Sequence, residues 1–149
     1  MLTQAAVAST RAAMTRARGL ARDLQERMFG APAEISRALA DHLPGLGVEA
    51  CVIAAITSRS PEDGLGELRF GFGPGRLHVT QDALSLARLA QHPLLEASRT
   101  LFLLPIALGA EPLGVAAFSV TTQLARSDLL EDLRELLAPV LKLSQNHHG

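Results

Sequence analysis

The chain is poor in aromatic residues: it has five phenylalanines, no tyrosine and no tryptophan. This scarcity argues against the aromatic surfaces on which nucleic-acid bases stack. Charge of either sign is nearly balanced, with a net value of −1, so no basic field predicts nucleic acid or an anionic membrane as a partner. The single cysteine, Cys51, excludes a disulfide within the chain and fits a reducing compartment. We therefore expect a cytoplasmic protein with no nucleic-acid partner.

Long apolar runs are scarce as well. One of the longest, over residues 101–108, is far shorter than the roughly 20 residues that a membrane-spanning helix needs. Five arginines spread through residues 1–29 interrupt any apolar stretch of the kind found in signal peptides. The sequence therefore predicts no membrane partner.

What the chain does contain is apolar material, mostly leucine and alanine. Hydrophobic residues make up 48% of its 149 positions, which suits one domain with a substantial core. Leucine and alanine also favour helices.

Residues 2–28 are predicted to form one long helix, because helix-forming residues dominate and Gly19 is the only interior breaker. A partial heptad predicts a seam that pairs with a second copy of the chain, and the alternative is that this helix packs across its own core. Residues 1–29 are thus interpreted as a signalling and dimerisation helix, and residues 30–149 as the globular domain. The predicted dimer interface consists of Ala6, Ala13, Ala17, Leu20, Leu24 and Met28.

The rest of the chain alternates between strand and helix patterns. Residues 48–57 form an apolar run typical of a buried central strand. Residues 67–72 alternate, which predicts Leu68, Phe70 and Phe72 on one face of a second strand. Hairpin connections predict an antiparallel sheet with helices packed on one face, an α+β fold. The other expected elements are a helix over 32–43, an edge strand over 76–79, a helix over 81–91, strands over 100–108 and 112–120, and a helix over 128–145.

Two segments resemble a GAF domain. Residues 35–55 form a helix that ends in a Leu-Pro-Gly-Leu-Gly turn and leads into an apolar strand, and residues 101–118 have the look of a GAF hairpin, with Pro105, Gly109 and Gly114 in the corresponding places. The resemblance implies an antiparallel sheet of five to six strands with long terminal helices. It also implies a sensory or dimerisation role in signal transduction, with room for a pocket on the sheet face away from the helices.

Ligands of two kinds of GAF domain do not fit this sequence. The Asn-Lys-x-Phe-Asp-Glu pattern of cyclic-nucleotide-binding members is absent from it, and Cys51 lies in the first strand, not where tetrapyrrole-binding members attach their chromophore. The sequence therefore predicts no cofactor, and the identity of any small-molecule ligand stays open.

Residues suited to catalysis or metal binding are scattered. Apolar neighbours predict a buried, inert Cys51, and His42, His78 and His92 show no metal-ligand spacing. The glycines of residues 64–75 are interpreted as turn residues, because a strand interrupts them where a phosphate-binding loop would need a helix. We therefore expect no enzyme and no metal site.

Two functional hypotheses remain open. The first is a regulatory domain that dimerises through its terminal helices and binds a small molecule on the sheet face opposite the helices. The second is a protein-interaction module with a filled interior, which the Leu/Ala-rich core and the lack of convergent polar residues favour. The acidic residues Asp128, Glu131, Asp132 and Glu135 place like charges four residues apart and predict a solvated or partner-facing surface, not paired catalytic carboxylates. A signalling protein is the expected partner beside the second copy. The candidate ligand-binding residues are Ile53, Arg69, Phe70, His78, Phe102 and Phe118, although core packing explains the apolar four equally well.

Overall fold

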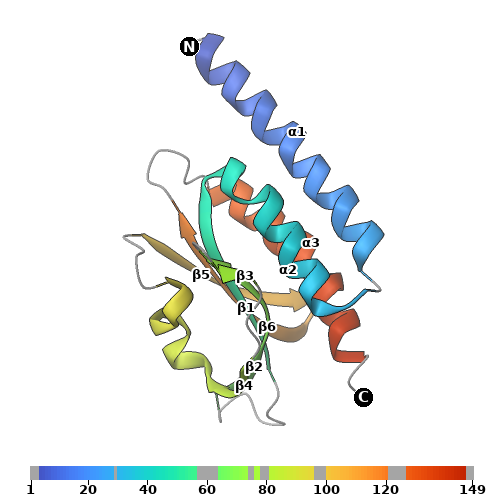
Figure 1. The fold of residues 1–149 in the computed structure, drawn as a ribbon, viewed down its shortest axis with the longest axis vertical. Helices are drawn as coiled ribbons and strands as arrows, with labels where there is room; N and C mark the ends of the chain where they lie inside the picture. The colour runs from blue at the N-terminus through green and yellow to red at the C-terminus, as the bar shows by residue number, and fades with distance from the viewer. Residues whose placement is uncertain are drawn as a thin grey trace.

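The computed structural model describes residues 4–28, 30–56, 64–73, 76–77, 81–95, 100–120 and 127–146 (Figure 1). Helices and antiparallel strands combine in one α+β domain, as the sequence predicts. The helices are α1 (Gln4–Arg27), α2 (Pro32–His42) and α3 (Ser127–Asn146), with short 3-10 helices η1 (Pro44–Leu46), η3 (Leu86–Gln91) and η4 (Pro93–Leu95). The strands are β1 (Val48–Ile56), β2 (Leu65–Gly73), β3 (Arg76–Leu77), β4 (Gln81–Ser85), β5 (Leu101–Leu108) and β6 (Glu111–Val120).

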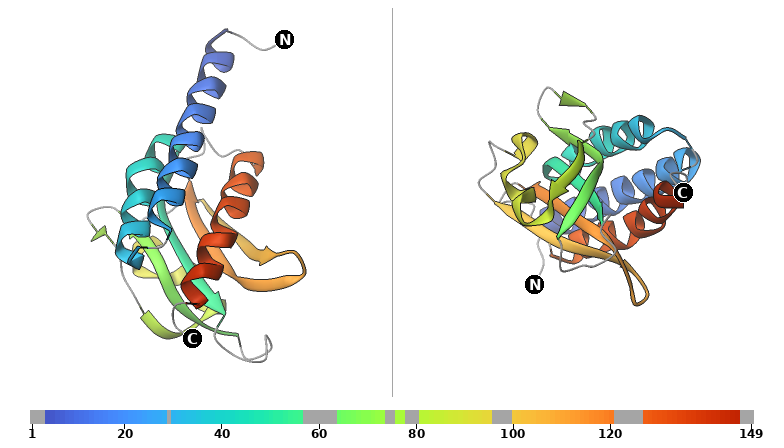
Figure 2. Two further views of the ribbon diagram at one scale, coloured as in Figure 1. Left: turned by 90° about the vertical axis from the view of Figure 1, so that its right-hand side faces the viewer. Right: turned by 90° about the horizontal axis from the view of Figure 1, so that it is seen from below.

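Among the described residues, the strands form one antiparallel sheet in the order β3-β2-β1-β6-β5, and β4 also pairs with β2. Helices α2 and α3 lie against one face, and α1 packs on their outer side (Figure 2). The segment η3–η4 lies on the opposite face (Figure 1). The sheet therefore separates a helical layer from a layer made of short 3-10 turns.

Strand β1 is the central strand, and it is buried along nearly its whole length. Its side chains alternate between two cores because successive residues of a strand point to opposite faces. Cys51, Ile53 and Ala55 join the core beneath the helices, whereas Val52 and Ala54 join the core beneath η3–η4. Burial on both faces explains why its sequence is continuously apolar.

Strand β2 departs from the predicted alternation at a bulge. Phe70 pairs with Ile53, but the next pair is Leu68 with Ala54, so Arg69 is an extra residue in β2. The bulge reverses the faces on its two sides. Leu68 therefore packs in the core beneath η3–η4 while Phe70 packs beneath the helices, and the prediction that these residues share one face is wrong.

The helix predicted over residues 81–91 is also wrong. Residues 81–85 form β4, and a 3-10 helix follows over Leu86–Gln91. The unpaired edge of β2 is the physical reason, since Leu65 pairs with Ser85 and Gly66 with Leu84. Pairing with that edge supplies hydrogen-bond partners for the backbone N–H and C=O groups of β2. This gain outweighs the weak helix propensity of residues 81–85.

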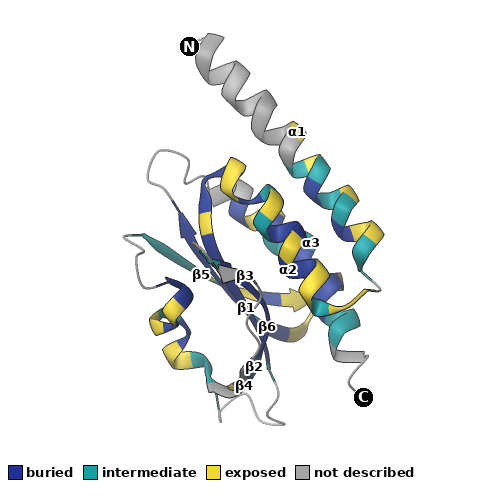
Figure 3. Ribbon diagram, viewed as in Figure 1, coloured by how far each residue is buried: buried dark blue, intermediate teal, exposed yellow. Residues whose placement is uncertain are grey.

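The C-terminal half of α1 belongs to the core of its own chain. Leu20 is fully buried and Leu24 is 2% exposed, and both join the cluster formed with α2 and α3 (Figure 3). These two residues were predicted at a dimer interface, and the structure corrects that interpretation, because their surface is already covered within one chain. The N-terminal half of α1 continues past the other helices (Figure 2).

In the part of the chain that the structure describes, no helix has the length and apolar character needed to cross a membrane.

Candidate functional site

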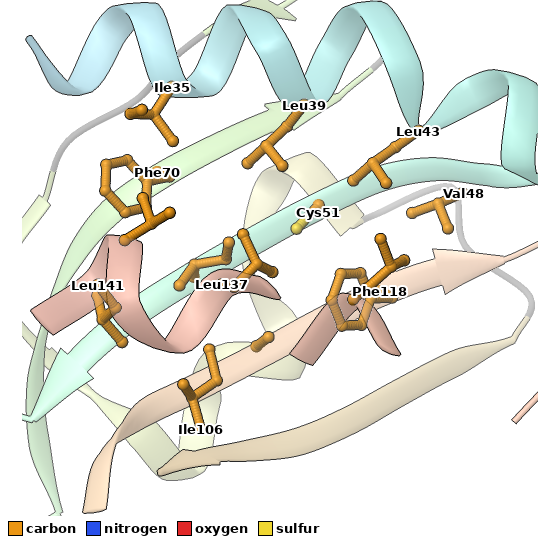
Figure 4. Close-up of a cluster of buried hydrophobic side chains, with 14 of the residues drawn as sticks. Ile35, Leu39, Leu43, Val48, Cys51, Phe70, Ile106, Phe118, Leu137 and Leu141 are labelled. Carbon is orange, nitrogen blue, oxygen red and sulfur yellow. The ribbon is translucent and has the colours of Figure 1, made fainter. Parts of the chain in front are cut away.

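The apolar residues predicted to line a ligand pocket lie in the helix-side core instead. Ile53, Phe70 and Phe118 are at most 1% exposed and belong to the cluster beneath α1, α2 and α3, and Phe102 packs against the same cluster. Figure 4 shows Phe70 beneath Ile35 of α2. These four side chains fill the space between sheet and helices, so they are not on the face for which the pocket was predicted.

In the part of the chain that the structure describes, leucines pack against the opposite face of the sheet. Leu89 of η3 and Leu94 and Leu95 of η4 are at most 4% exposed. They form one cluster with Val52 and Leu68 of the sheet. Among the described residues, these leucines therefore cover part of the sheet face on which a GAF-type pocket was expected.

Three glycines of β2 allow this close packing. A Cβ atom at Gly66 would lie 2.6 Å from Cδ2 of Leu86, and one at Gly71 would lie 3.2 Å from Cδ1 of Leu94. At Gly73 it would lie 3.0 Å from the carbonyl oxygen of Leu94. The interpretation of this glycine-rich segment as turn chemistry is therefore wrong at these positions, where glycine lets η3–η4 approach the strand.

Arg69, the predicted polar contact, sits at the bulge and is 6% exposed. Its Nη1 lies 3.3 Å from Oε1 of Glu67, and its buried Nε has no hydrogen-bond partner among the described residues. Its counter-charge thus comes from its own strand. His78, the other predicted polar contact, lies outside the described residues.

Cys51 is fully buried, as predicted, and burial raises the pKa of its thiol far above the ordinary value. A thiolate at this position would be desolvated, so Cys51 is a poor nucleophile or metal ligand. His92 has a local role, because its Nδ1 accepts a hydrogen bond from the Leu94 amide at 3.1 Å. The described residues contain no group of His, Cys, Asp and Glu that could hold a metal ion.

A polar contact joins α1 to α2. Oδ2 of Asp23 lies 3.1 Å from Nε2 of His42, and Oδ1 of Asp23 lies 2.7 Å from Nε of Arg27. A Cβ at Gly19 would lie 3.5 Å from Cε1 of His42, an ordinary van der Waals contact, so the imidazole does not require glycine at this position. The sequence pattern does not predict the contact between Asp23 and His42, and only the four-residue spacing of Asp23 and Arg27 indicates the ion pair within α1.

The described residues line two hollows on the helical layer. The first, which we term the α1–α3 hollow, is lined by Ala17, Arg18, Ala21, Asp132, Glu135 and Leu136. The second lies at the start of α2 and is lined by Arg27, Ala33, Glu34 and Arg37. Of the predicted interface residues, Ala17 is half-buried in the α1–α3 hollow and Met28 packs against the helix-side core. The side chains of Ala6 and Ala13 lie outside the described residues.

This architecture matches solved structures of GAF domains. The GAF domain of a phosphoenolpyruvate-protein phosphotransferase (ptsP) from Coxiella burnetii aligns with a TM-score of 0.56 and 12% sequence identity, covering 91% of this chain and 96% of that chain. The GAF domain of A. aeolicus nlh2 in an inactive state aligns with a TM-score of 0.51 and 16% identity, covering 88% and 94%. This chain has a GAF-like fold.

The GAF-like fold extends to an enzyme. Free methionine-R-sulfoxide reductase from Neisseria meningitidis, in complex with its substrate, aligns with a TM-score of 0.53 and 11% identity, covering 99% of this chain and 96% of that chain. No protein-family model and no curated protein sequence matches this chain. At these identities the likeness establishes the fold alone, so the function of this GAF-like domain has to be argued from its own side chains.

Proposed function

We propose that this GAF-like domain is a non-catalytic regulatory domain of a cytoplasmic signalling system, which acts through protein contacts made by its terminal helices. The observation that carries the proposal is the filled sheet face. Leu89, Leu94 and Leu95 occupy the side on which a small molecule would bind. Because the described residues of that face pack against one another, we place communication on the helical layer.

The shape of α1 supports this role. Its C-terminal half is held in the core by Leu20 and Leu24 and tied to α2 by Asp23 and His42. Its N-terminal half continues beyond the domain (Figure 2). A helix that is fixed at one end and extended at the other transmits a change in the domain to whatever it contacts. In this proposal the C-terminal half of α1 belongs to the domain core, and its N-terminal half serves as the signalling and dimerisation segment.

Two features favour protein interaction over ligand sensing or catalysis. Glycines at positions 66, 71 and 73 allow Leu86 and Leu94 to pack closely against β2. Such close packing favours a filled interior over an open ligand pocket. Cys51, a thiol that could act as a nucleophile, is buried in its neutral form. The partners we propose are a second copy of the chain and a signalling protein.

Native mass spectrometry of the purified chain, under gentle and then denaturing conditions, tests this proposal. The expected result is a dimer that carries no additional mass. A dimer with a reproducible small molecule that is lost on denaturation would overturn the filled-face argument. A bare monomer at every concentration up to about 100 µM, above the micromolar-to-picomolar affinities of standard-size interfaces, would overturn dimerisation through the helices.

A further inference from the structure

Strand β5 forms one edge of the sheet. Among the described strands it pairs only with β6, so the backbone groups on its outer side have no strand partner in this part of the chain. Its eight residues, LFLLPIAL, include no charged side chain. Sheet proteins usually protect an edge with charges, with very short strands or with a covering helix or loop. The β5 edge has the length and composition to accept a further strand.

The hydrogen bonding of β5 determines which of its backbone groups point outward. The Thr100 carbonyl accepts a hydrogen bond from the Val120 amide at 3.1 Å, so the backbone of Thr100 points toward β6. Residues of an antiparallel strand alternate in this respect, and the backbone groups of Leu101, Leu103 and Pro105 therefore point to the free edge. Pro105 agrees with this assignment, because it has no N–H to donate to β6.

The same stretch of β5 presents apolar side chains beside its edge. Leu103 pairs with Ala117, which packs in the core beneath η3–η4, so Leu103 points to that side of the sheet. Leu103 is nevertheless 50% exposed, and Pro105 is exposed as well. On the other side of the sheet α3 packs against β5. A strand added at the edge would cover Leu103 with its own side chains, because directly opposite residues of paired strands are in contact.

We infer that the free edge of β5 binds an extended, uncharged and apolar segment of a partner protein, which pairs with residues 101–105 as a further strand of the sheet. Backbone groups supply the affinity of such a complex, and Leu103 selects apolar side chains at alternate positions of the segment. Charge adds to this choice, because Glu111 at the hairpin end of β5 is already paired with Lys142. The inference goes beyond the proposed function, since it concerns the sheet edge and not the terminal helices.

A second copy of the chain fits this edge less well than a strand from another protein. Antiparallel pairing of two β5 strands centred on Leu103 would place Pro105 of each copy opposite Leu101 of the other. Proline has no N–H, so the Leu101 carbonyl would lack a donor in both copies. A segment without proline supplies that N–H. The missing donor of Pro105 therefore favours a partner of different sequence.

A titration of the isotope-labelled full chain, followed by NMR, tests the inference. The probe is a capped peptide in which valine and threonine alternate, because both are uncharged and favour strands. The control peptide has the same side chains but carries methyl groups on its backbone nitrogens, so it cannot donate the hydrogen bonds of a strand. Only the unmethylated peptide is expected to shift the amide signals of Leu101 and Leu103. No shift of either signal up to about 1 mM peptide would overturn the inference.

Two substitutions locate the binding site. Leu103→Pro removes an outward N–H and leaves the hydrogen bonds to β6 in place, and Leu103→Lys adds a charge beside the edge. Each is expected to raise the dissociation constant of the peptide about tenfold, because a peptide carbonyl loses its donor in the first and a charge is desolvated in the second. Leu65→Lys is the matched control, since Leu65 is a 45% exposed leucine of β2, and it is expected to bind the peptide with wild-type affinity.

The outcomes decide between a partner protein and a second copy. Weaker peptide binding by a folded Leu103→Lys chain whose state of association is unchanged supports the inference. Wild-type peptide affinity in that folded variant would overturn it, even where Leu103→Pro fails to fold. If Leu103→Lys instead converts a wild-type dimer into a monomer during analytical ultracentrifugation, the β5 edge joins two copies of the chain, and the assignment to a partner protein is wrong.

Discussion

Replacing Leu94 with alanine tests whether the sheet face opposite the helices is a packed core. Leu94 is 4% exposed and lies in the cluster with Val52, Ala54 and Leu68. Its side chain is also the nearest neighbour of a Cβ built at Gly71, so little space surrounds it. Substitution of a buried leucine by alanine costs about 2–5 kcal/mol through lost transfer free energy and the cavity left behind.

The expected loss for Leu94→Ala falls in the lower half of that range, about 2–3 kcal/mol. Leu94 belongs to the smaller of the two cores and is 4% exposed, so we expect the short η4 helix to settle partly into the space left by the side chain. A domain of this size has about 5–15 kcal/mol of stability in total. The substitution therefore removes a large share of it without unfolding the chain.

Urea unfolding followed by circular dichroism measures this loss. Leu103→Ala is the matched control, because Leu103 is 50% exposed on β5, and its truncation is expected to change the free energy of unfolding by less than about 0.5 kcal/mol. The dissociation constant of the dimer is expected to stay the same in Leu94→Ala, since the helical layer lies on the other side of the sheet. Equal losses for Leu94→Ala and Leu103→Ala would refute the filled-face reasoning.

Three further sets of changes test other parts of the structure. Gly19→Ala is expected to stabilise the chain by up to about 1 kcal/mol, because α1 gains helix propensity and the new Cβ stays 3.5 Å from His42. Gly66→Ala is expected to destabilise it by about 1–3 kcal/mol, because its Cβ would lie 2.8 Å from the Ala55 carbonyl oxygen; thermal unfolding that ranks the two substitutions in the other order would contradict the packing argument. Asp23→Asn removes the carboxylate that faces His42 and is expected to speed amide hydrogen exchange in α1 but not in β1, whereas equal exchange would place the α1 anchor elsewhere. Burial raises the pKa of the Cys51 thiol, so a thiol reagent is expected to react only after unfolding, and rapid labelling of the folded chain would refute this. The free energy of unfolding is also expected to fall at alkaline pH, where only the unfolded thiol loses its proton.

The elements that the sequence predicted well are those whose pattern depends on burial alone. The continuous apolar run of β1 identified a strand covered on both faces. The helix predicted over residues 32–43 matches α2, whose buried side chains include Ile35 and Leu39. The β5–β6 hairpin and α3 were predicted for the same reason, and the GAF resemblance of these segments agrees with the solved structures.

The candidate ligand residues show where this reasoning stops. Sequence pattern indicated that Ile53, Phe70 and Phe118 are inward-facing, and they are buried. Which of the two sheet faces each one joins depends on strand register, and a single bulge at Arg69 exchanges the faces within β2. The alternation of side chains does not indicate which face of the sheet the helices cover. The residues predicted to line the pocket therefore lie on the helix-covered face.

The sequence by itself determined the periodicity of each segment, and with it the two terminal helices, the central strand and the absence of a motif for catalysis, because these depend on local spacing and residue type. Only the tertiary structure shows that residues 81–85 pair with β2 and that glycines of β2 make room for Leu86 and Leu94. It also shows that Leu20 and Leu24 of α1 pack in the core of their own chain. Each of these features depends on a segment that is distant along the chain. Leaving the backbone edge or apolar surface of that segment uncovered would cost more free energy than local conformational preference contributes.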